Sequence, residues 1–304
     1  MINNITVLGA GTMGRRIAKL FASHGFATTL FDSNSSALQY ADETINQYVN
    51  EPGVKFKKII ITRDLGSAVA EADWIIESVS EDLRIKRELY ASITPFLKND
   101  RVVVSSNTST LPLSVLSLGL PFAARMLITH FFNPADVIPL VEVVKLENAI
   151  SELVDDVVDA LKSCGKSPVV LHKEIEGFIA NRLQAAVLRE AIFLIDQGIA
   201  GVPEIDEVMK QSIGLRWSLN GPLEVADYGG LDIWEKVLQN LMPLLNNSTE
   251  VPGIIKEKVL SNDLGVKTGR GFYKHDQSSI AKEADHFEKK LINLLNALHS
   301  IKHG

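Results

Sequence analysis

Short runs of β-branched and aromatic residues alternate with helical stretches over about the first 170 residues, and this alternation is what most constrains the fold. The runs with strand character are 5–8, 28–31, 58–61, 74–78, 102–105, 126–131, 140–144 and 169–171. Residues 12–24 and 84–93 lie between such runs and carry apolar residues at helical spacing. This pattern is typical of parallel strands joined by crossover helices, so we predict an α/β domain with a doubly wound parallel sheet over residues 1–174.

The alternation stops at Glu174, and the remaining chain has the spacing of helices. Residues 178–197 are apolar on more than one face, so a helix there needs cover on several sides. We therefore predict an all-α domain over residues 175–276 and a charged amphipathic helix over residues 277–304. We expect one face of the apolar helix to pack against a second subunit, which would make the protein a homodimer.

Composition excludes several classes of protein. A chain of 304 residues with 46% apolar side chains can bury a sizeable core. A net charge of -6 argues against nucleic-acid binding, and no run reaches the roughly 18 uncharged apolar residues of a membrane helix. The single cysteine, Cys164, excludes an internal disulfide and a cysteine-based metal cluster. We expect a soluble, cytoplasmic protein without a metal site that acts on a small molecule.

Three glycines, Gly9, Gly11 and Gly14, form a G-x-G-x-x-G motif between the first predicted strand and the first predicted helix. In that position the first glycine permits a tight turn, and the second lets the main chain approach a pyrophosphate. The third lets helix and strand pack closely, while the anion binds the exposed N–H groups of the helix. The motif predicts a dinucleotide site.

Asp32 ends the second predicted strand, where a carboxylate accepts hydrogen bonds from the adenine ribose of a dinucleotide. Its charge would repel the 2′-phosphate of NADP. The next two residues, Ser33 and Asn34, include no arginine to offset that repulsion. The sequence therefore predicts NAD as the cofactor.

His130 and Glu142 lie in two neighbouring predicted strands, with Pro134 and Pro139 marking a turn between them. A hydride leaves an alcohol carbon as the hydroxyl proton is removed, and imidazole suits that proton transfer near neutral pH. A carboxylate on the other ring nitrogen would fix the tautomer and stabilise the imidazolium. Spacing alone also fits a buried structural histidine beside a strand-end acid, so both interpretations stand at this point.

Three further polar residues lie where a ligand is expected. Asn107 and Ser109 follow the strand predicted at 102–105, and ligands of open α/β sheets bind outside the carboxyl ends of strands. The same two residues also fit ordinary turn chemistry. Asn181 lies in the first turns of an apolar helix, where an amide needs a hydrogen-bonding partner.

The segments GAGTMG, SNTS, HFFNP, LVEV, GFIANRL, GPLEVADYGGLD and KTGRGFY follow one another in the order found in the 3-hydroxyacyl-CoA dehydrogenase family, which the chain resembles up to about Lys274. The resemblance implies a Rossmann-type NAD domain, a helical domain that dimerises, and substrate held between them. It implies that His130 is the general base, that Glu142 orients it, and that Ser109 and Asn181 hydrogen-bond the substrate or the histidine. The residues implied around NAD are Gly9, Gly11, Thr12, Met13, Gly14, Asp32, Glu81, Lys86, Asn107, Asn133 and Lys267.

Two departures from the family concern the substrate. Members of the β-oxidation branch have a long helical excursion after the second strand that touches coenzyme A, and residues 41–59 look shorter here. Residues 214–224 are more similar to the gulonate dehydrogenase, λ-crystallin and carnitine dehydrogenase branches. Arg216 lies in this segment and would bind a substrate carboxylate, although a structural ion pair would also explain an arginine at this position.

We predict NAD-dependent oxidation of a short-chain 3-hydroxyacyl-CoA, such as 3-hydroxybutyryl-CoA, in fatty acid metabolism. One alternative is the same chemistry on a small free hydroxy acid. A second alternative, of another class, is a non-catalytic dinucleotide-binding or structural protein, because fold alone does not establish activity.

Overall fold

The computed structural model describes residues 1–46, 56–276 and 278–303, and the chain forms two compact units, Met1–Ile179 and Ala180–Gly304. Part of the shortened segment 41–59 and the predicted boundary at residue 277 lie outside the described residues. The boundaries predicted at 174 and 276 stay predictions.

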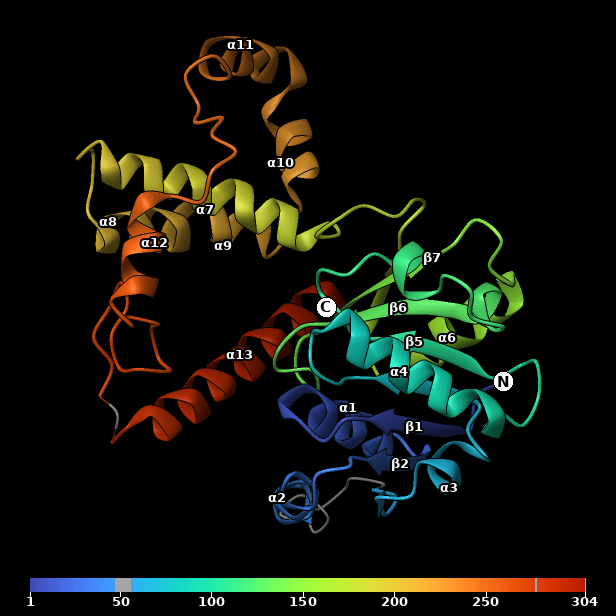
Figure 1. Ribbon diagram of the computed structural model, residues 1–304. Coiled ribbons are helices and arrows are strands. Elements are labelled where there is room, and N and C mark those ends of the chain that lie inside the picture. Colours follow the sequence, from blue (N-terminus) through green and yellow to red (C-terminus); the bar gives the residue numbers. More distant parts are fainter. Residues whose placement is uncertain (47–55, 277, 304) are drawn as a thin grey trace. The chain divides into compact units, whose positions relative to one another are not determined.

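The first unit, coloured from blue to yellow-green in Figure 1, is built on one eight-stranded sheet with the order β3-β2-β1-β4-β5-β6-β7-β8. Its strands are β1 (Asn4–Leu8), β2 (Ala27–Phe31), β3 (Ile60–Thr62), β4 (Trp74–Glu77), β5 (Val103–Ser106), β6 (Met126–Phe131), β7 (Leu140–Lys145) and β8 (Ser167–Val170). The predicted fold class is confirmed, since β1 to β6 pair in parallel. However, β7 runs antiparallel to β6, and β8 runs with β7. Residues 132–139 are too few for a parallel crossover, which takes about a dozen residues or more.

Helices cover both faces of this sheet. They are α1 (Thr12–Ser23), α2 (Ser35–Asn46), α3 (Leu65–Val69), α4 (Leu83–Ile93), α5 (Leu113–Leu116) and α6 (Ser151–Ser163), with 3-10 turns η1 (Thr94–Phe96) and η2 (Ala123–Arg125). The apolar side chains of α1, α2 and α6 join one core cluster, and those of α3, α4 and α5 join a second. Successive residues of β4 alternate between them, because Trp74 and Ile76 lie in the first cluster and Ile75 in the second.

The sequence pattern predicted α1 and α4 but did not identify α2 or α6. In α6, Val154 and Val157 favour strands by intrinsic propensity. Both are buried in the core together with Leu153 and Leu161, and this burial outweighs the propensity of single residues.

The second unit is helical, as predicted. It comprises α7 (Ala180–Asp196), α8 (Val202–Val208), the π-helix η3 (Met209–Ile213), α9 (Gly214–Trp217), α10 (Pro222–Gly229), α11 (Leu231–Leu241), α12 (Gly253–Leu260) and α13 (Ile280–His303). Ile192 is its one buried apolar residue in the described ranges. Among the helices described, none is both long and apolar enough to cross a membrane.

Candidate active site

The glycine motif forms the turn between β1 and α1, and the turn leaves no room for side chains at two of its positions. A Cβ at Gly14 would lie 1.8 Å from the Gly9 carbonyl oxygen, and one at Gly9 would lie 2.5 Å from that of Ser78. Gly9 also has a φ of 109°, which favours glycine. A Cβ at Gly11, by contrast, would meet no atom within 4 Å, so the space above the start of α1 is open. This cradle fits a pyrophosphate on the N–H groups of the helix.

Asp32 lies beside this turn. Its carboxylate accepts hydrogen bonds from the main-chain N–H of Ala10 and of Asn34, each at 2.8 Å. The carboxylate is half-buried and therefore accessible to a ribose hydroxyl. The glycine turn and Asp32 together fit the adenosine and pyrophosphate parts of NAD.

Glu77 ends β4 fully buried and accepts four hydrogen bonds. Oε1 accepts from Lys86 Nζ (2.7 Å) and the main-chain N–H of Val79 (2.8 Å), and Oε2 accepts from Tyr90 (2.7 Å) and Ser106 (2.6 Å). Burial raises the pKa of Tyr90 far above its ordinary value, and the charge of Glu77 adds to that effect. Glu77 thus connects α4 to the carboxyl ends of β4 and β5. We did not identify Glu77, Tyr90 or Ser106 from the sequence, although an acid inside the apolar run at 74–78 was a usable signal.

Glu81 holds the loop that follows β5. It accepts hydrogen bonds from Thr108, from both the hydroxyl and the N–H of Thr110, and from the Ser109 N–H (3.2 Å), and it pairs with Lys86 at 3.2 Å. Burial by itself would raise the pKa of Glu81. The Thr108 hydrogen bond and the Lys86 charge outweigh burial and hold this pKa below its usual value. Lys86 is 1% exposed and bound to two carboxylates, so in this structure it supports the loop. Direct contact of Glu81 and Lys86 with NAD stays a prediction.

Asn107 connects three strand ends. Its Oδ1 accepts a hydrogen bond from the Phe131 N–H at 3.0 Å, and its Nδ2 lies 3.5 Å from Ser78 Oγ. Asn107 is thereby fixed at the carboxyl edge of β4, β5 and β6. Ser109 lies two residues further along the same loop and is half-buried.

His130 and Glu142 are register partners on β6 and β7, and their side chains meet. His130 Nδ1 lies 2.9 Å from Glu142 Oε2, with 7% and 1% of the two side chains exposed. When Nδ1 donates this hydrogen bond, Nε2 is left to accept a proton. The second carboxylate oxygen, Oε1, accepts a hydrogen bond from the main-chain N–H of Ile179 at 2.9 Å. The sequence prediction that these strands bring the two residues together agrees with this geometry.

Two phenylalanine rings pack against the imidazole of His130. The ring centroid of Phe132 lies 4.4 Å from that of His130, and the centroid of Phe178 lies 5.3 Å away, both in tilted arrangements. Such contacts stabilise a ring orientation by about 0.5–1.5 kcal/mol. They limit the positions that the imidazole can take.

The loop between β6 and β7 is attached to helix α1. Asp136 pairs with Arg16 at 2.6 Å and with Lys19 at 3.1 Å. Burial by itself would raise the pKa of Asp136. The two cations outweigh burial and hold this pKa below its usual value. Asn133, a predicted NAD contact, opens this loop and is exposed, with a cis peptide bond to Pro134.

Lys166 holds the same loop through its main chain. Its Nζ donates hydrogen bonds to the carbonyl oxygens of Ala135 (2.7 Å) and Ile138 (2.8 Å). Burial lowers the pKa of Lys166 to about 8. The loop that connects the two strands of the dyad is thus held by both Lys166 and α1.

Three predicted site residues belong to the second unit. Asn181 is half-buried in the first turn of α7, and Lys267 is exposed in the glycine-rich segment. Arg216 is exposed in α9, with Nη2 3.4 Å from Ser212 Oγ and Nε 3.5 Å from the Ser212 carbonyl oxygen. The ion pair considered as an alternative for Arg216 is not among its contacts in the described part of the chain. The ligand contacts of all three residues stay predictions.

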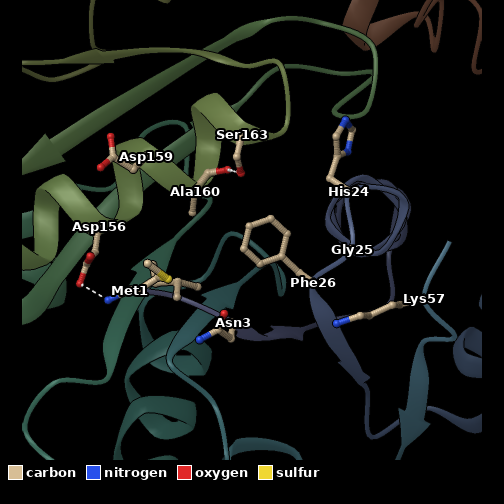
Figure 2. A pocket seen from close by; sticks show the side chains of 11 residues that line it. Met1, Asn3, His24, Gly25, Phe26, Lys57, Asp156, Asp159, Ala160 and Ser163 are labelled. Carbon is tan, nitrogen blue, oxygen red and sulfur yellow. Dashed lines mark hydrogen bonds and ion pairs between the residues drawn. The ribbon is translucent and has the colours of Figure 1, made fainter. Parts of the chain in front are cut away.

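A pocket of about 420 Å³ lies at the opposite, amino edge of the sheet (Figure 2). Met1 and Asn3 before β1, Phe26 before β2, and Asp156 and Ser163 of α6 line it. The glycine turn and the dyad lie at the carboxyl edge, so this pocket is separate from the candidate active site. Within the described residues no group of three His, Cys, Asp or Glu side chains could hold a metal ion.

Comparison with known proteins gives two matches to family models. The model of the 3-hydroxyacyl-CoA dehydrogenase NAD-binding domain matches residues 4–175, and that of the C-terminal domain matches residues 177–275. The chain is 31% identical over 281 residues to 5-formyl-3-hydroxy-2-methylpyridine 4-carboxylate 5-dehydrogenase of Mesorhizobium japonicum, covering 90% of this chain and 91% of that protein. It is also 31% identical over 293 residues to human mitochondrial hydroxyacyl-coenzyme A dehydrogenase, covering 90% and 92%.

Among solved structures, that of a 5-formyl-3-hydroxy-2-methylpyridine 4-carboxylic acid 5-dehydrogenase, described as an NAD⁺-dependent dismutase, is similar with a TM-score of 0.92. The two sequences are 29% identical, and the match covers 98% of this chain and 99% of that one.

Proposed function

Because the chain belongs to the 3-hydroxyacyl-CoA dehydrogenase family and is an NAD-dependent oxidoreductase, we propose that it oxidises the 3-hydroxyl of a short-chain 3-hydroxyacyl-CoA to the 3-keto form, reversibly. One observation carries this proposal: the buried pair of His130 and Glu142 at the carboxyl edge of a sheet whose glycine turn fits NAD. This arrangement argues against the non-catalytic alternative, because a purely structural protein does not need a buried histidine–carboxylate pair beside a dinucleotide site.

The chemistry needs a hydride acceptor and a base. Bound NAD supplies the acceptor at its nicotinamide ring. His130 Nε2 takes the hydroxyl proton as the carbonyl forms, and Glu142 stabilises the resulting imidazolium through Nδ1. General-base catalysis of this kind contributes about 10²- to 10⁴-fold. In the reverse direction His130 returns the proton.

Further residues would orient the imidazole and the substrate. Phe132 and Phe178 cover the imidazole with apolar surface. Ser109 and Asn181 would hydrogen-bond the substrate oxygen, each supplying a donor for charge that develops on it. Asn107, whose Oδ1 accepts a hydrogen bond from the Phe131 N–H, would contact the cofactor.

A second candidate is a small carboxylate substrate without coenzyme A. Its support is the similarity, over nearly the whole chain, to a dehydrogenase of a pyridine carboxylate aldehyde. The hydrate of an aldehyde loses a hydride from carbon and a hydroxyl proton, giving the acid, so His130 would take the same role. Arg216 would then bind the carboxylate bidentately. The free hydroxy acids gulonate and carnitine belong to the same candidate class.

The test follows NADH absorbance with acetoacetyl-CoA, 3-hydroxybutyryl-CoA, gulonate, carnitine and 5-formyl-3-hydroxy-2-methylpyridine 4-carboxylate side by side. We expect turnover of the two thioesters, and a loss of about 10³-fold in His130→Gln. Turnover of the pyridine aldehyde alone, abolished in Arg216→Met, would favour the second candidate. Full activity of His130→Gln on every substrate would overturn the catalytic proposal.

We also propose that the working form is a cytoplasmic homodimer. Support for the dimer comes from α7, where Leu183 and Leu188 are 56% and 51% exposed. The compartment rests on cysteine usage alone.

A further inference from the structure

Residues 174–179 lie between β8 and α7 and contact the dyad near their carboxyl end. Glu174 accepts hydrogen bonds from the main-chain N–H groups of Leu113 and Ser114 at the start of α5. At the other end of the segment, the Ile179 N–H donates to Glu142 Oε1 at 2.9 Å. The segment is therefore attached to α5 at one end and to the dyad at the other.

Phe178 takes a backbone conformation that phenylalanine rarely adopts. Its φ is 51°, in the left-handed region, directly after Gly177 with a φ of 74°. A non-glycine residue there costs about 1–2 kcal/mol. The side chain is nevertheless 2% exposed, with its ring 5.3 Å from that of His130. A costly conformation that places one ring against a reacting group indicates a functional constraint.

The two contacts act on different parts of the dyad. Glu142 Oε2 faces His130 Nδ1, so a donor on Oε1 limits rotation of the carboxylate about its last side-chain bond. The ring of Phe178, together with that of Phe132, limits rotation of the imidazole. Nε2 of His130 is then held in one place, and proton transfer depends steeply on such placement.

We propose that the main-chain amide of Ile179 and the ring of Phe178 are positioning groups for the His130–Glu142 pair. This inference rests on the proposed role of His130 as a base. Each of the two groups acts through one member of the pair, the amide through Glu142 and the ring through His130. Because both hold groups that serve proton transfer, their loss is expected to lower kcat and leave the KM for NAD nearly unchanged.

The amide is tested by replacing Ile179 with its α-hydroxy acid, which converts the peptide bond to an ester and removes only the N–H. We expect kcat to fall about tenfold, since one hydrogen bond to a charged group is lost. The matched control is the same replacement at Ile233, whose N–H bonds the Gly230 carbonyl in the second unit. That control also loses one main-chain hydrogen bond, to a neutral carbonyl oxygen, and should keep kcat within about twofold.

The ring is tested with Phe178→Leu and Phe178→Gly. Leucine keeps apolar bulk, and glycine relieves the strained φ, yet both are expected to lower kcat by about three- to tenfold with an unchanged KM for NAD. Asn262→Gly is the control, because Asn262 is the other described non-glycine residue with positive φ (56°) and is exposed in the second unit. It should leave kcat unchanged.

Failure of this inference differs from failure of the proposed function. The positioning role alone would be overturned by a wild-type kcat in both Phe178→Gly and the variant with an ester bond at Ile179, provided that His130→Gln is inactive. An active His130→Gln would overturn both. A rise in the KM for NAD equal to the fall in kcat/KM would also count against positioning of the base.

Discussion

The two units of this chain differ in how they bury apolar side chains. The first unit has two closed core clusters, one on each face of its sheet. In the second unit Ile192 alone is buried among the described apolar residues, while Leu223, Tyr228 and Leu260 are 82%, 83% and 86% exposed. Single exposed apolar residues are ordinary, but a whole unit of them is not. The first unit encloses its core between its own sheet and helices, whereas the second unit leaves many large apolar side chains exposed.

The two units also differ in whether their buried charged groups have hydrogen-bonding partners. In the first unit Glu77, Lys86, Glu142 and Lys166 are buried, and each has hydrogen-bonding partners. In the second unit Arg189 Nε is buried without a partner, the one such side-chain atom in the described part of the chain. Buried polar groups ordinarily have partners. The buried charged groups of the first unit are therefore satisfied within that unit, whereas the described part of the second unit leaves Arg189 Nε unsatisfied.

The largest expected effect is on stability. Phe21 is fully buried, with ring contacts to Phe26, Trp74 and Phe131, so Phe21→Ala should lower the free energy of unfolding by about 3–5 kcal/mol. Tyr228→Ala in the second unit should change it by less than about 0.5 kcal/mol. Urea denaturation followed by circular dichroism measures both. A large loss in the Tyr228 variant would mean that this side chain is covered in the working protein.

The next effect is on assembly. Leu183 is 56% exposed on α7, and Leu183→Glu should convert the proposed dimer to single chains, because an interface would bury the new carboxylate. Light scattering should then give about half of the wild-type mass. Leu118→Glu, at a position 66% exposed in the first unit, should leave the mass unchanged. A wild-type mass of one chain would refute the dimer.

The third effect is on cofactor affinity. Gly11→Ala places a methyl group in open space where we expect the pyrophosphate, so the Kd for NADH should rise about tenfold with little change in stability. Gly253→Ala in α12 also meets no atom within 4 Å and should leave the Kd unchanged. NADH fluorescence titration measures both. An unchanged Kd in Gly11→Ala would argue against this binding mode.

The smallest effect concerns pH. The folded protein holds the pKa of Asp136 below its usual value of 3.8, so the stability from its ion pairs is present above that pH and is lost as pH falls below it. Asp136→Asn should cost about 1.5 kcal/mol at neutral pH. On acidification the wild type and the variant should converge in their free energies of unfolding. A difference between them that stays constant down to about pH 2 would refute the assignment.

Much of the first unit could be predicted because its signals are local. A glycine motif between a strand and a helix, and an acid at the end of the next strand, identify a dinucleotide site from spacing alone. The boundaries of the strands at 58–61 and 169–171 were shifted by one or two residues, since hydrogen bonds to neighbouring strands set their ends.

The groups that support the site could not be predicted in the same way. Tyr90 and Ser106 bond Glu77 from 13 and 29 residues away, and the Ile179 amide reaches Glu142 across 37 residues. No periodicity encodes such distances. Lys86 illustrates the difference further, because its ion pairs with Glu77 and Glu81 were not predicted from the sequence, while the cofactor contact implied by the family resemblance stays a prediction.

By itself the amino-acid sequence determined the succession of the strands along the chain, the glycine cradle, the preference for NAD and the candidate base with its carboxylate. These features depend on residues close together in the chain, where steric and hydrogen-bonding rules act directly. Only the tertiary structure decided that β7 is reversed, that Glu77 joins three elements, and that Phe178 and Ile179 contact the dyad. Those depend on packing between distant segments, because the cost of burying charge and strained backbone is met only where the folded chain brings compensating groups together.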